Sequence, residues 1–194
     1  MNLEDRMQYI VLDLEWNQPV SKQKMVQMPI RLRGEIIQIG AVKVDENMRT
    51  IDTFNILIKP KYYEKMNKRV QQLTDITDAQ LETGAPFEIA FERFRDWCGT
   101  TFEFVTWGPD DIYMLEDNLL IYGLDIDWIP AAYDAQVIFD DQVTMEDRNF
   151  SLGYAMYKCG IKPLKCHDAL NDAINTVKVL THLDVASSFD VAAY

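Results

Sequence analysis

A short and almost continuously apolar segment near the N-terminus constrains the fold more than any other part of the sequence. Residues 9–14 read YIVLDL and are followed directly by Glu15. An apolar run of this length is typical of a strand that lies inside a sheet and is buried on both faces. We therefore expect a central strand here, in an α/β fold whose helices pack on the faces of the sheet.

Patterns farther along the chain supply the other elements of such a fold. Strands are expected at 35–44 and 51–58, which form a hairpin, and at 101–106 and 132–137. Helices are expected at 86–98, 110–122, 151–158 and 168–183, where apolar side chains recur at helical spacing. This order predicts a mixed five-stranded sheet flanked by helices. We expect one domain over residues 1–184, followed by a short C-terminal tail over residues 185–194.

The composition excludes several classes of protein. Hydrophobic residues make up 48% of the chain, which favours a folded domain over a disordered one. The 31 Asp and Glu residues outnumber the 19 Lys and Arg residues, and the net charge of -12 argues against a protein that coats duplex nucleic acid. The apolar runs are shorter than the ~20 residues needed to cross a bilayer, and the start lacks the basic segment of a secretion signal. We expect a cytoplasmic protein without membrane contact.

The three cysteines, Cys98, Cys159 and Cys166, form an odd and scattered set. Without Cys-x-x-Cys spacing they predict neither a disulfide framework nor a zinc ribbon. Cys166 directly precedes His167, so a cysteine hydrolase is one alternative function. It is disfavoured because adjacent residues cannot easily aim at each other as nucleophile and base.

Two acids in the apolar N-terminal strand are the most informative residues. Side chains alternate along a strand, so Asp13 and Glu15 project from one face while Leu12 and Leu14 fill the other. Two carboxylates on one face repel each other unless a cation joins them, and Mg²⁺ or Mn²⁺ prefers such oxygen ligands. The alternative is that the strand ends at Leu12 and both acids are solvated.

A second pair of acids, Asp110 and Asp111, follows the strand expected at 101–106. Open α/β sheets gather ligands beyond the C-terminal ends of their strands, so one of these acids is a candidate ligand. The alternative is that Asp110 or Asp111 only caps the following helix, a position where Asp is favoured.

The third group opens the last long helix. Asp172 borders the apolar stripe of this helix and is expected near the core, whereas His167 is expected on the entry loop, five residues earlier. A loop histidine can accept a proton near neutral pH. The alternative is that His167 is only a surface or packing residue. Asp168 is interpreted as the N-cap of the helix rather than as a ligand.

In this order, the three groups resemble the motifs of the DEDDh 3′-5′ exonuclease family. This family includes ribonuclease T and the proofreading (epsilon) subunit of bacterial DNA polymerase III, and the chain looks most like the small stand-alone exonucleases of the ERI-1 and KapD type. The resemblance spans about residues 8–183. It includes residues 35–42 (EIIQIGAV), 73–77 (LTDIT) and 167–173 (HDALNDA), with Asp75 where the family usually has Gly.

The second motif departs from the family pattern. Residues 106–111 read TWGPDD, whereas the family usually has His-Asn-x-x-Phe-Asp. The register assigns the family's Asp to Asp111 and places Asp110 at the usual aromatic position. The choice between Asp110 and Asp111 therefore stays open.

The resemblance implies an RNase H-like exonuclease fold and a two-metal-ion phosphodiester hydrolase. It implies two divalent cations, Mg²⁺ or Mn²⁺, held by Asp13, Glu15, Asp111 and Asp172, with His167 taking a proton from the attacking water. These five residues are the expected catalytic set. The expected activity is release of nucleoside 5′-monophosphates from the 3′ ends of single-stranded RNA or DNA, with RNA slightly favoured. The expected substrate contacts are Leu14, Glu15, Trp16, Thr74 and Ile76, several of them by packing on bases; Trp16 and Trp107 are alternatively core residues.

The distribution of charge adds a separate observation. Residues 17–34, 59–69 and 158–165 hold twelve of the nineteen basic residues and one acid, Glu64. Two of these segments adjoin the first and third motifs, which favours local contact with a nucleic acid end. The alternative is that they form solvated surface.

A catalytically silent relative that binds nucleic acid or protein is the competing function. It is disfavoured because a binding module does not need a cluster of buried acids. The oligomeric state is left open.

Overall fold

The computed structural model describes residues 7–146, 148–185, 187–188 and 192–194. It contains a five-stranded sheet in the order β3-β2-β1-β4-β5. The strands are β1 (Gln8–Asn17), β2 (Glu35–Val44), β3 (Thr50–Leu57), β4 (Phe102–Thr106) and β5 (Ala132–Asp134). β1 pairs antiparallel with β2 and parallel with β4. The predicted mixed sheet with a central N-terminal strand is therefore confirmed.

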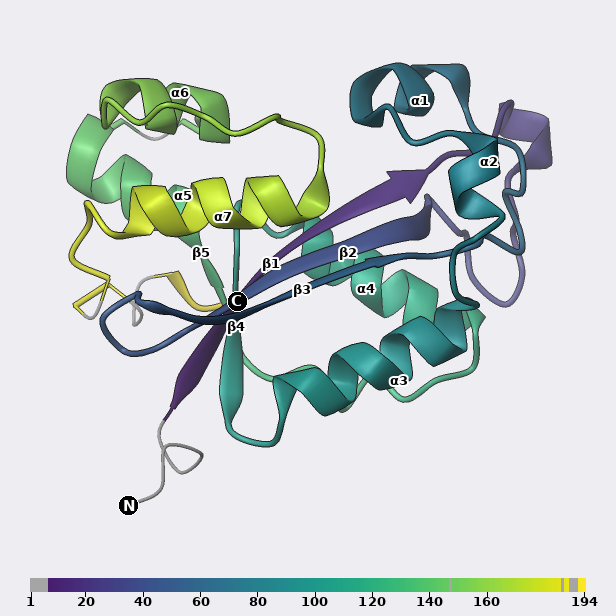
Figure 1. Ribbon diagram of the computed structural model, residues 1–194, viewed down its shortest axis with the longest axis horizontal. Coiled ribbons are helices and arrows are strands. Elements are labelled where there is room, and N and C mark those ends of the chain that lie inside the picture. The colour runs from purple at the N-terminus through teal and green to yellow at the C-terminus, as the bar shows by residue number, and fades with distance from the viewer. Residues whose placement is uncertain (1–6, 147, 186, 189–191) are drawn as a thin grey trace.

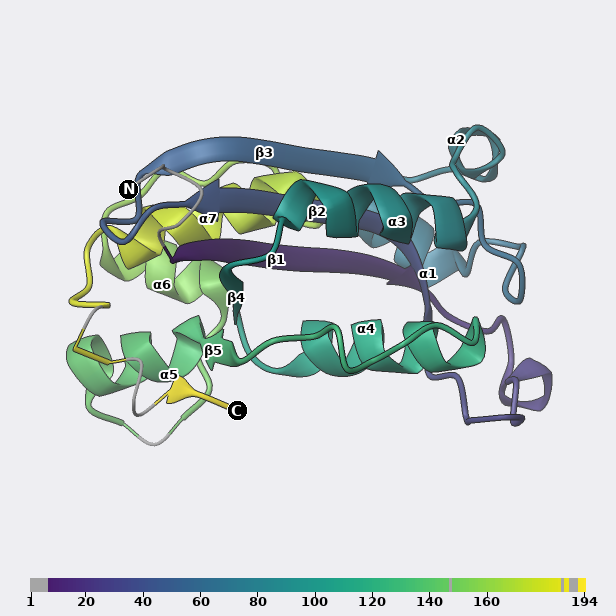
Figure 2. The ribbon, with the colours of Figure 1, turned by 90° about the horizontal axis from the view of Figure 1, so that it is seen from below.

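Helices cover both faces of the sheet (Figures 1 and 2). One face packs against α3 (Phe87–Cys98) and α4 (Asp110–Ile121). The other packs against α5 (Ala135–Phe139) and α7 (Ala169–Leu180), and α6 (Leu152–Lys158) packs on these two helices. Two short helices, α1 (Lys68–Thr74) and α2 (Asp78–Leu81), lie near the C-terminal end of β1. The single-turn helices η2 (Lys22–Lys24) and η3 (Asp140–Thr144) complete the described elements.

The apolar side chains of β1 divide between two cores. Ile10 and Leu12 join the core under α3 and α4, and Val11 joins the core under α7. Because side chains alternate along the strand, Asp13 and Glu15 share the face of Val11. The fold therefore turns both acids towards α7.

One local expectation was wrong, and two short helices were missed. The strand expected at 132–137 ends at Asp134, because the Asp134 carboxylate accepts the N–H groups of Gln136 (2.8 Å) and Val137 (3.4 Å) and thereby starts α5. The helices α1 and α2 were not expected. They lie in a polar, charge-rich stretch, and buried side chains such as Val70 and Leu81 attach them to the domain.

The described residues at the C-terminus return to the sheet. Ala193 pairs antiparallel with Tyr133, and the Tyr194 N–H donates to the Ala132 carbonyl (3.0 Å). Residues 1–6 of the expected domain, and residues 186 and 189–191 of the expected tail, lie outside the described residues. Among the helices that are described, none is long and apolar enough to cross a membrane.

Candidate active site

The central strand carries the first two acids. β1 continues through Asp13 and Glu15 to Asn17, so the alternative that the strand ends at Leu12 is wrong. Asp13 lies opposite Gly40 of β2, and a bulge shifts the register between Glu15 and Trp16. Both carboxylates are half-buried beneath the start of α7.

Gly40 permits the close approach of α7 to this pair. A Cβ atom at position 40 would lie 2.1 Å from the carbonyl carbon of Ala169 and 2.1 Å from the nitrogen of Leu170. Only glycine leaves room for this backbone contact. The side-chain carbonyl of Gln38 also accepts the Ala169 N–H (3.2 Å), so β2 fixes the first turn of α7 beside Asp13.

The start of α7 orients the third group. The Asp168 carboxylate accepts the Asn171 N–H (3.1 Å), which confirms Asp168 as the helix cap. Asp172 is buried, and its carboxylate accepts the backbone N–H of His167 (2.7 Å) and the side-chain amide of Asn175 (3.3 Å). The bond to His167 holds the entry loop against α7, and the bond to Asn175 fixes the carboxylate within the helix.

His167 lies exposed at the rim of the acidic cluster. Its φ of 59° is in the left-handed region, which tightens the loop before α7. Potential ligand atoms of Glu15, His167 and Asp172 all lie within 4.8 Å of one another. The histidine and two of the expected acids therefore meet at one place, although they come from different elements.

The second motif brings in Asp111. Its side chain is only 6% exposed, and its carboxylate accepts the Leu14 N–H of β1 (2.9 Å). Asp110 is exposed. The capping alternative is wrong, because the N-cap is Pro109, which has no polar side chain, and both acids lie in the first turn of α4.

Burial makes this cluster difficult to ionise. It is the main reason that the pKa of Asp13 lies well above its ordinary value, followed by the charges of Asp111 and Glu15. Burial, followed by the Asp172 and Asp111 charges, raises the pKa of Glu15 to about 8. Burial raises the pKa of Asp111 to about 7 and also raises that of Asp172, against the opposing effect of the N–H groups that these carboxylates accept.

The residues fit a site for divalent cations. Four carboxylates from three elements converge, and in the described part of the chain none of them forms an ion pair with Lys or Arg. Hard cations such as Mg²⁺ and Mn²⁺ take oxygen ligands of this kind and would lower the pKa values of the acids. The four acids are Asp13, Glu15, Asp111 and Asp172.

The side chains expected to contact bases are mostly buried. The Leu14 and Ile76 side chains are 3% and 6% exposed and lie in the apolar core, and their expected contact with bases stays a prediction. Thr74 is buried and bonded to the backbone on both sides of it. Trp16 is half-buried against the core under α4. Leu73, the first residue of the LTDIT segment, is 45% exposed.

Two further candidates from the sequence, Trp107 and Cys166, lie in surroundings that do not indicate a catalytic role. Trp107 packs beside Phe139 and donates its ring N–H to the Phe150 carbonyl (3.0 Å), as in the core alternative. Burial and the nearby Asp172 charge raise the pKa of the Cys166 thiol. A raised pKa keeps the thiol protonated, which disfavours the cysteine hydrolase.

The comparisons with known proteins place the chain in a family. A family model described as exonuclease (RNase T) matches residues 10–180, and the chain belongs to this exonuclease family. Its relatives include a PolC-type DNA polymerase III of Thermotoga petrophila (28% identical over 145 residues, covering 75% of this chain and 10% of the polymerase). They also include the probable 3′-5′ exonuclease KapD of Bacillus subtilis (27% identical over 113 residues, covering 57% of this chain and 52% of KapD). The chain thus spans about a tenth of the first and about half of the second.

Solved structures show the same fold. The nuclease domain of 3′hExo, a DEDDh family member bound to rAMP, superimposes with a TM-score of 0.79 at 17% identity, covering 96% of each chain. The cell-death related nuclease CRN-4 superimposes with a TM-score of 0.76 at 19% identity, covering 96% of this chain and 64% of the other. The predicted RNase H-like exonuclease fold and the resemblance to DEDDh exonucleases are confirmed.

Proposed function

We propose that this chain is a metal-dependent 3′-5′ exonuclease that hydrolyses phosphodiester bonds and releases nucleoside 5′-monophosphates. The observation that carries the proposal is the convergence of four buried or half-buried acids with His167 at the C-terminal half of β1. Membership of the exonuclease family supports it. An acidic cluster whose pKa values are raised costs stability, so a chemical role explains its presence better than packing does.

Within this proposal Asp13, Glu15, Asp111 and Asp172 hold two divalent cations, Mg²⁺ or Mn²⁺. Bound cations would supply an activated water and neutralise charge at the scissile phosphate. Asp111 is assigned rather than Asp110 because its buried carboxylate is fixed by the Leu14 N–H, whereas Asp110 is exposed. Glu15 also faces the rim beside His167, where the terminal 3′ nucleotide is expected.

His167 is proposed to accept the proton of the attacking water. Its side chain is exposed, so substrate and solvent can reach it, and its backbone N–H is held by the Asp172 carboxylate at 2.7 Å. This contact sets the position of the imidazole relative to the acids without using a ring nitrogen. Such positioning is what a general base requires.

The proposed substrates are the 3′ ends of single-stranded RNA or DNA, with RNA slightly favoured. Support for RNA comes from the likeness to 3′hExo, whose nuclease domain was solved with rAMP, and to a 3′-exonuclease that recognises the 3′ end of a histone mRNA stem-loop. A cytoplasmic location, one exonuclease domain over residues 1–184 and a tail over residues 185–194 complete the proposal.

The test is a product assay on matched 5′-labelled RNA and DNA oligonucleotides, single-stranded and duplex, with Mg²⁺, Mn²⁺ or EDTA. We expect stepwise shortening from the 3′ end, release of nucleoside 5′-monophosphates and complete loss of both in EDTA. An Asp13→Ala variant serves as the inactive control. If the wild-type protein binds the oligonucleotides but releases no mononucleotide with either cation, the silent nucleic-acid-binding alternative replaces the proposal.

A further inference from the structure

Two basic segments that are separate in the sequence meet beyond the C-terminal end of β1. Asn17, the last residue of β1, is fully buried, and its side-chain amide donates to the carbonyls of Tyr63 (2.7 Å) and Lys65 (2.9 Å). Its side-chain oxygen accepts the Asn67 N–H (2.9 Å). The connection from β1 to β2 is thereby joined to residues 59–69.

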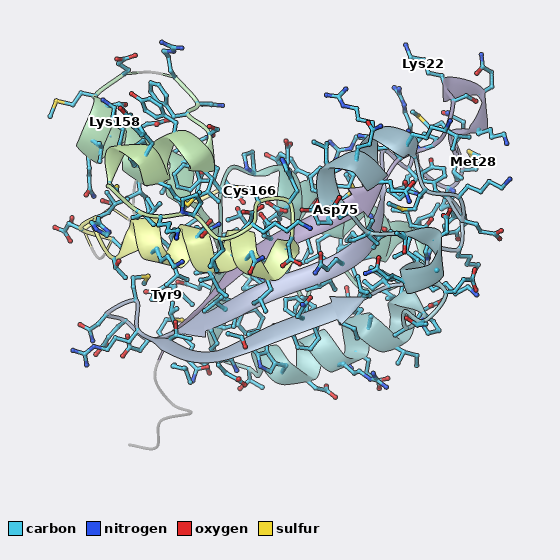
Figure 3. All side chains as sticks on the ribbon, turned by 45° about the horizontal axis from the view of Figure 1, so that its top comes forward. Tyr9, Lys22, Met28, Asp75, Lys158 and Cys166 are labelled. Atoms are coloured by element: carbon cyan, nitrogen blue, oxygen red, sulfur yellow. The ribbon has the colours of Figure 1, made fainter. Side chains whose placement is uncertain are left out.

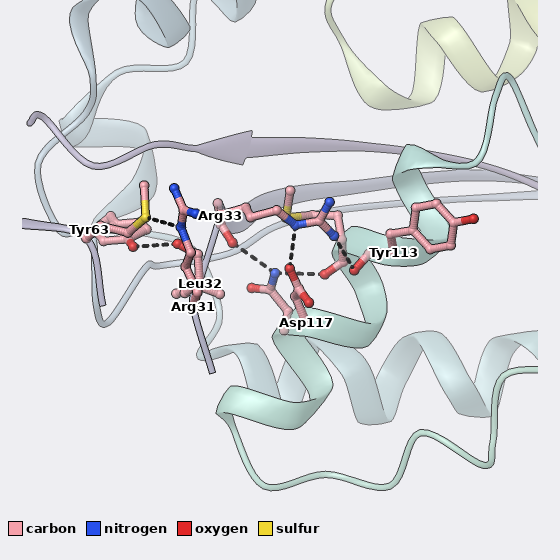
Figure 4. Close-up of polar contacts among 10 residues, drawn as sticks. Arg31, Leu32, Arg33, Tyr63, Tyr113 and Asp117 are labelled. Carbon is pink, nitrogen blue, oxygen red and sulfur yellow. Dashed lines mark hydrogen bonds and ion pairs between the residues drawn. The ribbon is translucent and has the colours of Figure 1, made fainter. Parts of the chain in front are cut away.

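Further contacts hold the β1–β2 connection in place, as Figure 4 shows. The Tyr63 hydroxyl donates to the Leu32 carbonyl (2.8 Å). The Arg33 guanidinium pairs with Asp117 of α4 (2.8 Å) and donates to the Tyr113 carbonyl (3.4 Å). The end of this connection that leads into β2 is therefore held against α4 and residue Tyr63.

These segments present a group of cations that we call the basic surface. Its members are Lys22, Lys24, Lys61, Lys65, Lys68 and Arg69. All six are exposed, and none forms an ion pair with a carboxylate in the described part of the chain. Lys24 and Lys65 line the same shallow pocket although they come from different segments.

The two segments that carry the basic surface are joined at Asn17, which lies two residues beyond Glu15, roughly 7 Å along an extended strand. The basic surface therefore lies beyond the end of β1 that carries Asp13 and Glu15. On the other side of the site, Lys165 pairs with Asp75 (2.8 Å). Cation–π contacts occur on both sides: the Lys158 ammonium lies 5.5 Å from the Tyr154 ring centroid, and the Lys61 ammonium lies 5.5 Å from the Tyr62 ring centroid. Figure 3 shows Asp75 and Cys166 between Lys158 at one end and Lys22 at the other.

We infer that the basic surface binds the phosphates of the single strand on the 5′ side of the nucleotide being removed. This inference rests on the proposed exonuclease function. Lys and Arg side chains contact phosphates without reading the bases, so the surface selects for strand length rather than sequence. Because the whole chain carries a net charge of -12, a polyanion is repelled elsewhere and guided to this surface.

Apolar side chains in the same region suit an unpaired strand. Met28 is 79% exposed and Val20 is 49% exposed, and both lie in the β1–β2 connection that carries Lys22 and Lys24. Exposed apolar groups beside cations can pack on the faces of unstacked bases, which a duplex does not offer. The substrate class is therefore an oligonucleotide with several unpaired nucleotides before its 3′ end.

The test compares two double variants that remove equal charge. Lys24→Gln/Lys65→Gln lies in the basic surface, and Arg93→Gln/Arg95→Gln removes two exposed cations from α3 on the opposite face of the sheet. The probe is a fluorescent single-stranded RNA longer than ~16 nucleotides, the upper end of known single-strand site sizes. Its affinity is measured by fluorescence anisotropy in EDTA across a range of salt concentrations. We expect Lys24→Gln/Lys65→Gln to bind the RNA roughly tenfold more weakly than the wild type. Because two phosphate contacts are lost, the magnitude of its slope of log affinity against log salt concentration should fall by about 1.4. The α3 variant should match the wild type in both.

A second readout separates this inference from the proposed function. The ratio of kcat/KM for the long RNA to that for a dinucleotide should fall roughly tenfold in Lys24→Gln/Lys65→Gln. Equal affinities, salt slopes and ratios in wild type and both variants would overturn the inference while leaving the exonuclease proposal intact. If the wild type hydrolyses neither substrate but shows the expected salt slopes, the exonuclease proposal fails and nucleic acid binding by this surface stands. Lys68→Gln/Arg69→Gln, in the first turn of α1, should weaken binding in the same way.

Discussion

The ammonium group of Lys165 lies 2.8 Å from the Asp75 carboxylate and joins the loop before α7 to the turn after α1. The same ammonium donates a hydrogen bond to the Thr74 carbonyl (3.5 Å). Lys165 is two residues from His167, and Asp75 has a left-handed φ of 61° where the resemblance leads one to expect Gly. The pair therefore ties the loop that carries His167 to the LTDIT segment.

Breaking this pair should affect catalysis more than stability. Asp75→Asn keeps a residue that tolerates left-handed φ and removes only the charge. Because the pair is exposed and screened by solvent, we expect only a small loss in the free energy of unfolding. We also expect faster amide hydrogen exchange over residues 164–168 and a lower kcat. Glu82→Gln is the control, since it breaks the Lys59–Glu82 pair (2.6 Å) of similar exposure outside the acidic cluster; an equal fall in kcat in both variants would contradict a positioning role.

The assigned roles of Asp13 and His167 predict different losses. Asp13→Ala removes a half-buried ligand and should abolish activity and weaken Mn²⁺ binding, measured by calorimetry. His167→Ala should lower kcat by about 10²–10⁴ because it removes a general base, with Mn²⁺ affinity close to that of the wild type. A ring nitrogen of His167 lies within 4.8 Å of carboxylate oxygens of Glu15 and Asp172, so it is close enough to be a metal ligand. Mn²⁺ binding therefore distinguishes a ligand from a general base. Equal losses of Mn²⁺ binding would make His167 a ligand instead.

Gly40 should be the most sensitive position outside the acids themselves. Gly40→Ala places a methyl group 2.1 Å from the α7 backbone, which cannot rotate away. We expect a loss of roughly 1–3 kcal/mol or more in the free energy of unfolding, and reduced activity because Asp172 moves with α7. Gly153→Ala in α6 is the control, because its Cβ would meet nothing closer than the Ser151 hydroxyl oxygen at 4.0 Å. Gly153→Ala should be neutral or stabilising by up to ~1 kcal/mol; comparable destabilisation of both variants would remove the special role of Gly40.

Much of the fold follows from patterns that act over short distances. The apolar run at residues 9–14 predicts the central strand because such a strand must be apolar on both faces, and the period of two places Asp13 and Glu15 together. The same alternation places Leu14 on the opposite face. Leu14 is 3% exposed and lies in the apolar core, as this alternation requires, and its expected contact with bases stays a prediction.

The parts that sequence reasoning missed depend on contacts between distant residues. Gln38 and Ala169 are 131 residues apart, and nothing local to Gly40 shows that a helix will rest on it. The helix α1 begins among cations and is stabilised by burial of Val70. Short helices of this kind depend on tertiary packing rather than on their own propensity. The meeting of Asn17 with Tyr63 likewise appears only in the folded chain.

The raised pKa values predict how metal-free stability depends on pH. A carboxyl group whose pKa is higher in the folded protein than in the unfolded chain costs stability as pH rises above its unfolded pKa, and the full cost is reached above the folded pKa. For Glu15 this window runs from the ordinary 4.5 to about 8. In EDTA, Tm should therefore fall between about pH 5 and pH 8, and millimolar Mg²⁺ should oppose the fall because it binds the ionised acids.

An Asp13→Asn variant supplies the matched comparison for this dependence. It removes one acid from the cluster while leaving an oxygen in place, so its Tm in EDTA should change less with pH across the same window. Differential scanning fluorimetry at several pH values with EDTA and with Mg²⁺ measures both effects. A wild-type Tm in EDTA that rises towards pH 8 would contradict the burial of these carboxyl groups.

The two adjacent acids of α4 give the last prediction. Asp111 is buried and its carboxylate accepts the Leu14 N–H at 2.9 Å, whereas Asp110 projects into solvent. Asp111→Asn retains an oxygen that can accept this N–H, so the fold should persist while the loss of a ligand charge abolishes turnover and weakens Mn²⁺ binding. Asp110→Asn removes a surface charge and should retain most activity. Circular dichroism confirms folding of both variants, and single-turnover cleavage of a 5′-labelled oligonucleotide measures the difference. If Asp110→Asn loses activity and Asp111→Asn keeps it, the assignment of the ligand passes to Asp110.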